Sequence, residues 1–274
     1  MRVFLGRIAG SLALLASSLL LTFIALEFVV FAFILVPDDV LPNVSINGVV
    51  RYEPGRQATF RHPDGTATSV SINADGWNTS KPAYDRKRNF GVKRVAVVGD
   101  SYVHAAFVDT ADGFPEVLER TLNRSGRVAE VYRFGMDGAP LSQYLNVVRR
   151  EVVTYRPDVV VVTLIHNDFD ESTRFLGTRY NSSFMKIGVD AAGQPREIAA
   201  QDFAPGFADV LRASRTFRYL YYETNAYLRL KGFVSKYVWG EAEVIAPELV
   251  SSAVDIRALR DDRAYAPATR YVMG

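Results

Sequence analysis

Ser101 follows an apolar run in this sequence and has a side chain able to do covalent chemistry. Residues Val95 to Val98 form a continuous, β-branched-rich run, typical of a strand buried on both faces of a parallel sheet. The run stops at Gly99-Asp100, and a polar, helix-compatible segment follows. Because open α/β sheets place reactive groups at the carboxyl ends of their strands, Ser101 is a candidate nucleophile.

Two more predicted strands end in residues that suit the same chemistry. The predicted strand 128–133 is followed by a segment that holds Gly135 and Gly138, and the predicted strand 158–165 is followed by Asn167. Strand, helix, strand, helix, strand in this order predicts two βαβ units and a parallel sheet. The three strand ends thus present a serine, a glycine pair and an asparagine.

This combination resembles the SGNH (GDSL-type) hydrolases, in particular the membrane-anchored cell-envelope type of bacteria. The match covers about Val95 to Asp168 and consists of a GDS serine block, an oxyanion glycine and an asparagine in an ND dipeptide. The resemblance implies a flavodoxin-like α/β fold, a three-layer sandwich with a parallel sheet. It also implies an acyl-serine intermediate, with no cofactor and no metal.

The resemblance assigns a role to each site residue. Ser101 would be the nucleophile, and its backbone N–H would be one oxyanion donor. Gly138 would give a second N–H, in preference to Gly135, because it lies just before the helix that Pro140 opens. The side-chain amide of Asn167 would be the third donor. Asp100 is interpreted as a carboxylate that organises the loop, since the family takes its triad acid from a later D-x-x-H block.

That D-x-x-H block does not occur in the sequence, so no catalytic His or Asp is predicted in this chain. The residues three positions before the three histidines are Thr59 for His62, Ser101 for His104 and Thr163 for His166. The hydrolase domain is therefore predicted to be incomplete, as in a fragment of a longer protein. His104 lies three residues after Ser101 and is an alternative base. The preferred interpretation of His104 and His166 is packing or surface.

Three functions remain open from the sequence. The first is hydrolysis of acyl esters, such as acetyl groups on envelope glycans or lipids. The second is O-acyl transfer to an envelope polysaccharide through the same intermediate, and the third is a catalytically inert envelope scaffold. A net charge of +2 gives no field that would argue for nucleic acid as a partner. The absence of cysteine excludes disulfides and thiolate metal sites.

The amino terminus predicts a membrane anchor over residues 1–36. The run from Ile8 to Val36 is apolar apart from small polar residues and Glu27, and it exceeds the roughly 20 residues that span a bilayer. A cleaved signal peptide has a shorter apolar core. Arg2 and Arg7 precede the run, which predicts a cytoplasmic amino terminus and a periplasmic or otherwise extracytoplasmic domain at a bacterial inner membrane. Glu27 is interpreted as an interfacial glutamate.

The rest of the chain is divided into a linker and small hairpin region, 37–92, and the hydrolase-like domain, 93–274. Within the first region, Asp38 to Gly55 is predicted to be a linker. The other predicted elements are hairpins over 58–72 and 184–198, helices starting near Pro115, near Pro140 and at Ser214 (to Val234), and weaker helical signals over 247–272.

Overall fold

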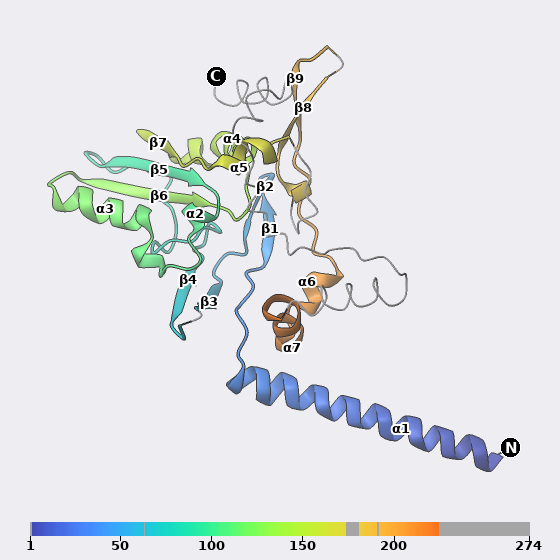
Figure 1. Cartoon of the computed structure of the whole chain (residues 1–274). Coiled ribbons are helices and arrows are strands. Elements are labelled where there is room, and N and C mark those ends of the chain that lie inside the picture. Colours follow the sequence, from blue (N-terminus) through green and yellow to red (C-terminus); the bar gives the residue numbers. More distant parts are fainter. Residues whose placement is uncertain (1, 63, 174–180, 191, 225–274) are drawn as a thin grey trace. The chain divides into compact units, whose positions relative to one another are not determined.

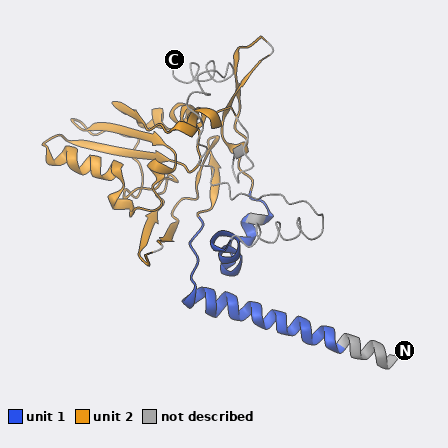
Figure 2. Ribbon diagram, viewed as in Figure 1, with its two compact units in different colours: residues 1–40, 205–248 blue, residues 41–204, 249–274 orange. Residues whose placement is uncertain are grey.

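The computed structural model describes residues 2–62, 64–173, 181–190 and 192–224 (Figure 1). The chain forms two compact units, residues 1–40 with 205–248 and residues 41–204 with 249–274 (Figure 2). In chain order the described elements are α1 (Arg2–Ala25), the π-helix η1 (Leu26–Ile34), β1 (Asn43–Ile46), β2 (Val49–Tyr52), β3 (Gln57–Arg61), β4 (Ala67–Ser71), β5 (Lys93–Gly99), α2 (Ser101–His104), η2 (Thr110–Asp112), α3 (Phe114–Arg124), β6 (Ala129–Gly135), α4 (Leu141–Arg150), η3 (Val152–Tyr155), β7 (Val159–Val162), α5 (His166–Glu171), η4 (Asn181–Ser183), β8 (Lys186–Val189), β9 (Pro195–Ile198), α6 (Phe207–Leu211), α7 (Arg215–Arg218) and the π-helix η5 (Tyr219–Glu223).

A three-stranded parallel sheet forms the centre of the larger unit, in the order β6-β5-β7. The register pairs Gly99 with Gly135 and Val98 with Val162, so the three strands end at the same edge. This confirms the predicted α/β class. Strand β5 extends beyond its predicted apolar run at both ends and β6 at its carboxyl end, whereas the apolar run of β7 continues past the last ladder hydrogen bond.

Side chains alternate between the two faces of the sheet, as the period of a strand requires. On one face, Val97 and Val131 pack with Leu118 and Leu122 of α3. On the other face, a larger cluster joins the strands to α4 and to the hairpins of the 41–92 region. Its members from the sheet are Ala96, Val98, Tyr132 and Phe134. Helices and hairpins thus cover both faces of β5 and β6, which makes these strands the middle layer (Figure 1).

The linker predicted for Asp38 to Gly55 was wrong over residues 43–52. Strands β1 and β2 pair antiparallel across a two-residue turn formed by Asn47 and Gly48. Both turn residues have left-handed backbone, with φ of 56° and 69°, which is the chemistry of an Asn-Gly hairpin turn. The hairpins predicted over 58–72 and 184–198 are confirmed as β3–β4 and β8–β9.

A buried ion pair connects β2 to the end of α4. Arg51 donates through both terminal nitrogens to the two carboxylate oxygens of Glu151, each at 2.9 Å, and both side chains are 2% exposed. The Tyr155 hydroxyl donates to the same carboxylate at 2.9 Å. A buried charge is stable only with partners of this quality, so the pair fixes the hairpin against the helix.

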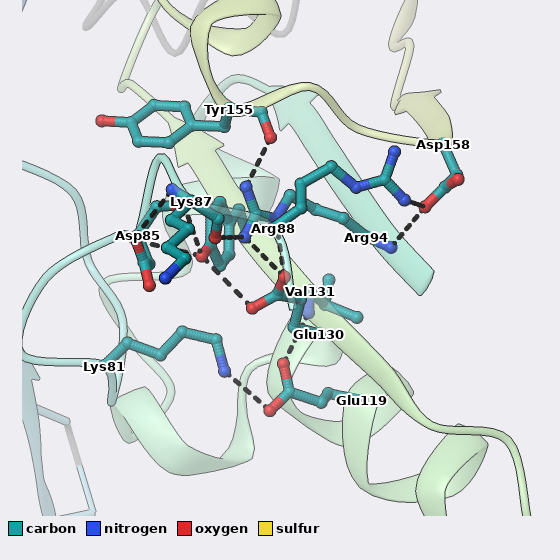
Figure 3. A network of polar contacts seen from close by, with 11 residues as sticks. Lys81, Asp85, Lys87, Arg88, Arg94, Glu119, Glu130, Val131, Tyr155 and Asp158 are labelled. Atoms are coloured by element: carbon teal, nitrogen blue, oxygen red, sulfur yellow. Dashed lines mark hydrogen bonds and ion pairs between the residues drawn. The ribbon is translucent and has the colours of Figure 1, made fainter. Parts of the chain in front are cut away.

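A second polar network closes the amino-terminal edge of the sheet (Figure 3). Arg94 of β5 donates to Glu130 of β6 at 2.7 Å and to the carbonyl of Tyr155 at 2.5 Å. Asp158, just before β7, accepts from the Arg94 backbone N–H and from Arg88, both at 2.8 Å. The basic loop 81–93 is thus held against the strands at the edge opposite Ser101.

Strand β7 lies at one edge of the sheet among the described residues, and its four valines are 37–51% exposed.

Helices near Pro115 and Pro140 are confirmed as α3 and α4. The helix predicted from Ser214 begins there as α7 and continues as η5 to Glu223. Its remainder to Val234, and the signals over 247–272, lie outside the described residues.

The helical segment Gly10–Ile34 is long and apolar enough to cross a membrane. Its position near the amino terminus means that a signal sequence would meet the same criteria of length and composition.

Removing one partner of the buried ion pair tests how the hairpin is held. Glu151→Ala leaves the Arg51 guanidinium buried without its carboxylate, so the free energy of unfolding should fall by about 3–5 kcal/mol. Arg56→Ala is the control, because the Arg56–Glu53 pair is exposed and its loss should not be measurable. Denaturant unfolding of the full chain in detergent measures both. Equal, small effects of the two substitutions would show that the buried pair does not hold the hairpin.

Candidate active site

Ser101 is the first residue of α2, directly after the central strand β5, and its side chain is exposed. The preceding Asp100 is buried and caps the helix by accepting from the Tyr102 N–H at 3.0 Å. Its second oxygen accepts from the Ser101 hydroxyl at 3.4 Å. Burial raises the pKa of Asp100, against the opposing effect of these hydrogen bonds. The carboxylate therefore orders the turn that presents Ser101.

Gly135 ends β6 where the backbone of α2 passes very close. A Cβ at this position would lie 2.2 Å from the backbone nitrogen of His104, so no larger residue fits without moving α2. The Met136 N–H donates to the Gly99 carbonyl at 3.2 Å, which extends the pairing of β5 and β6 by one residue. Gly135 thus sets the distance between the serine turn and the loop that carries Gly138.

Gly138 lies in the turn after β6, two residues before Pro140, which caps α4. Its φ of 67° is left-handed, a conformation that glycine adopts without strain. The residue is exposed. Its N–H therefore belongs to a tight turn at the same edge of the sheet as Ser101.

His104 is 1% exposed, and its Nδ1 contacts the Asp137 carboxylate at 2.7 Å and the Tyr52 hydroxyl at 2.9 Å. The Asp137 N–H donates to the same hydroxyl at 3.3 Å. Burial raises the pKa of Asp137, but the His104 ring and the hydrogen bonds from His104 and Tyr52 outweigh it and leave this pKa below its usual value. These contacts tie α2 to the Gly138 turn.

Asn167 is the second residue of α5, at the carboxyl edge beside β7, and is half-buried. Its side-chain amide donates to Glu171 at 3.0 Å. His166 precedes it and is exposed. The structure thus places Ser101, Gly138 and Asn167 at one edge of the sheet, and no hydrogen bond links them within the described part of the chain.

Asp168 is a further buried carboxylate at this edge, 1% exposed. One oxygen accepts from the Ile165 N–H at 2.8 Å, and the buried hydroxyl of Tyr144 lies close to the same carboxylate. Burial raises the pKa of Asp168 to about 7, and the nearby charge of Asp100 adds to the rise. Two buried acids are therefore next to the site residues in the chain, Asp100 beside Ser101 and Asp168 beside Asn167.

The larger unit also has a cavity of about 840 Å³ that includes none of these residues. It is lined from the carboxyl half of α4 and from residues 197–202, among them Asn146, Arg150 and Glu197. The candidate site is instead the exposed edge where the three strands end.

Asp168 makes the stability of this edge depend on pH. Its folded-state pKa of about 7 lies above the ordinary 3.8, so the stability it contributes is fully present below 3.8 and is lost as the pH rises through about 7. Asp168→Asn keeps an acceptor for the Ile165 N–H and does not ionise. Its thermal unfolding midpoint should match that of the parent chain near pH 4 and exceed it near pH 8.

Asp158→Asn is the control for this prediction. The backbone N–H of Arg94 and the Arg88 side chain lower the pKa of Asp158 to about 2, so its charge stabilises the chain across the same pH range. That variant should unfold at a lower temperature than the parent chain from pH 4 to pH 8. A difference between Asp168→Asn and the parent chain that does not change with pH would contradict the prediction.

Comparison with known proteins identifies the family of the segment that contains this edge. The model of the GDSL-like lipase/acylhydrolase family matches residues 95–242, more than half of the chain. No curated protein sequence matches. Solved structures with local similarity include TesA (25% identity, 33% of this chain and 51% of that chain, TM-score 0.28) and AlinE4, an SGNH-hydrolase family esterase (21% identity, 35% and 52%, TM-score 0.28). The chain spans about half the length of each. On the family match, with its serine turn at the end of β5, this chain belongs to the GDSL-like lipase/acylhydrolase family.

Proposed function

We propose that this chain carries the nucleophile and the oxyanion donors of a serine esterase. The observation that carries the proposal is an exposed Ser101 at the end of the central strand, with two neighbouring strand ends in register beside it. In the reaction the Ser101 oxygen bonds to the acyl carbon and the serine proton passes to a base. The ester C–O bond then breaks, and the base returns that proton to the leaving oxygen, which releases the alcohol. Water then attacks the acyl-serine and releases the acid.

The oxyanion of each tetrahedral intermediate would accept from the N–H groups of Ser101 and Gly138 and from the Asn167 amide. Asn167 gives one hydrogen to Glu171 in the structure, and its amide has two. The second hydrogen is therefore available for the oxyanion while the first holds the side chain in place.

The base is the part that this chain does not offer in the family's form. His104 has its Nδ1 on Asp137 and is buried, and no histidine of the sequence lies in a D-x-x-H block. Loss of a triad member in serine hydrolases leaves roughly 10³–10⁴-fold catalysis over water, because binding and the oxyanion donors remain. The chain alone should therefore be a weak esterase.

The apolar segment Gly10–Ile34 supports a second part of the proposal, that the chain is anchored in a membrane. Arg2 and Arg7 precede it, which favours a cytoplasmic amino terminus with the hydrolase domain on the other side. Acyl groups on envelope glycans or lipids are the substrates that such a position brings within reach.

Chemical rescue of the missing base tests the esterase proposal. Hydrolysis of p-nitrophenyl acetate by the full chain should be slow, and added imidazole should raise the part of the rate that depends on Ser101. Ser101→Ala corrects for hydrolysis by imidazole itself, and Asn167→Ala should lower the rescued rate by about 10²–10³-fold through loss of an oxyanion donor.

Three outcomes would change the proposal. A rescued rate unaltered by Ser101→Ala would favour an inert scaffold. Full activity without imidazole that His104→Ala abolishes would make His104 the base. Acyl delivery to an added oligosaccharide in preference to water would identify an O-acyltransferase.

A further inference from the structure

In the smaller unit, Glu27 of the apolar helix binds the start of α7. Its carboxylate accepts from the Ser214 hydroxyl and the Arg215 N–H, each at 2.8 Å, and from the Thr216 N–H at 2.9 Å. The side chain is buried, with 8% exposure. Three donors on one carboxylate account for a buried acid in an apolar helix, and they fix α7 to that helix.

Two further contacts extend this attachment. Phe31 is buried and stacks on Tyr219 of η5, with ring centroids 4.6 Å apart. Arg218 lies 3.3 Å from the Asp39 carboxylate. Residues 207–223 are here called the return segment, and its part from Ser214 to Tyr219 is bound to positions 27–39 of the same unit (Figure 2).

These positions correspond to a defined depth if the apolar helix crosses a bilayer. A hydrocarbon core about 30 Å thick takes roughly 20 helical residues, so a crossing that begins with the apolar run at Ile8 ends near Phe28. Glu27 and Phe31 then lie where hydrocarbon meets headgroups. An element bound to both lies in the interfacial layer.

The exposed surface of the return segment suits that layer. Its exposed large side chains are Phe207 (77%), Val210 (68%), Leu220 (44%), Tyr221 (40%) and Tyr222 (40%). Tyrosine is enriched at membrane–water interfaces because its ring is apolar and its hydroxyl is polar. Several exposed apolar and aromatic side chains on so short a segment need a partner that offers both apolar and polar groups.

The charged side chains of the return segment argue against a partner that is recognised by its negative charge. Arg212 pairs with Asp209, and Arg218 pairs with Asp39, so two of its three arginines are neutralised locally. The segment offers no strong positive field to anionic headgroups. The lipid interface itself, zwitterionic lipid included, is the partner that this surface fits.

We propose that the return segment lies in the interfacial layer of the membrane that the apolar helix crosses, with Phe207 and Leu220 among the lipid headgroups and Glu27 holding the segment at that depth. This inference rests on the proposed anchor. A second copy of the chain is the alternative occupant of the same surface, and the test below distinguishes it from lipid.

The chain contains no cysteine, so single cysteines introduced at Phe207, Leu220 and Ser125 can each carry an environment-sensitive NBD fluorophore. Ser125 is an exposed control position in the larger unit. The full chain is reconstituted in phosphatidylcholine vesicles with and without lipids spin-labelled near the headgroup. Quenching at Phe207→Cys and Leu220→Cys should exceed that at Ser125→Cys by roughly threefold or more, with little change on adding phosphatidylglycerol.

Glu27→Ala in the Leu220→Cys background should lower this quenching, because the segment loses its attachment. Phe28→Ala is the matched control, since Phe28 is exposed on the same helix and should leave the quenching unchanged. Protein that carbonate washing removes from the vesicles would refute both the anchor and the inference. Retained protein whose probes behave like the one at Ser125 would refute the inference alone. A blue-shifted probe that spin-labelled lipid does not quench would place a second copy there and also overturn it.

Discussion

The parallel pairing of β5 with strands on both sides is the constraint on which the rest of the larger unit depends. Because β6 and β7 are in register with it, three strands end together, and the residues that follow them must share one edge. Every candidate site residue is on one of these three extensions. The pairing therefore brings together residues that are up to 66 positions apart in the sequence, from Ser101 to Asn167.

Contacts at both edges keep that pairing in place. At the amino-terminal edge, Arg94 joins β5 to β6 and to the segment before β7. At the carboxyl edge, the close approach of Gly135 to α2 and the His104–Asp137 contact join the serine turn to the Gly138 turn. A preorganised edge is what oxyanion stabilisation requires, since the donors must be in place before charge develops.

Local sequence features predicted much of this arrangement. Apolar runs predicted β5, β6 and β7, and prolines predicted the starts of α3 and α4. The turn residues Asp64 and Gly65 predicted the β3–β4 hairpin. The Asn47-Gly48 turn carried an equally clear signal. The β1–β2 hairpin was not predicted because its strands are only four residues long and β2 buries an arginine. The usual alternation of apolar and polar residues along a strand is therefore hard to recognise there.

The partners of charged side chains could not be predicted from the sequence. His104 meets Asp137, which is 33 residues away, and Tyr52, from a segment predicted to be a linker. Glu27 meets donors about 188 residues away. Such pairs depend on which faces the tertiary fold brings together, and periodicity carries no information about that. The burial of Arg51 and Arg94 is a result of the same kind, because arginine is ordinarily a surface residue.

The central claim is that Ser101, Gly138 and Asn167 converge on one oxyanion at the edge of the sheet. A crystal structure of the chain with Ser101 phosphonylated by a fluorophosphonate tests this most directly, since the phosphoryl oxygen occupies the place of the oxyanion. The account predicts that this oxygen lies about 3 Å from the N–H groups of Ser101 and Gly138 and from the Asn167 amide. A phosphoryl oxygen that faces solvent, beyond hydrogen-bond distance of the Asn167 amide, would contradict it.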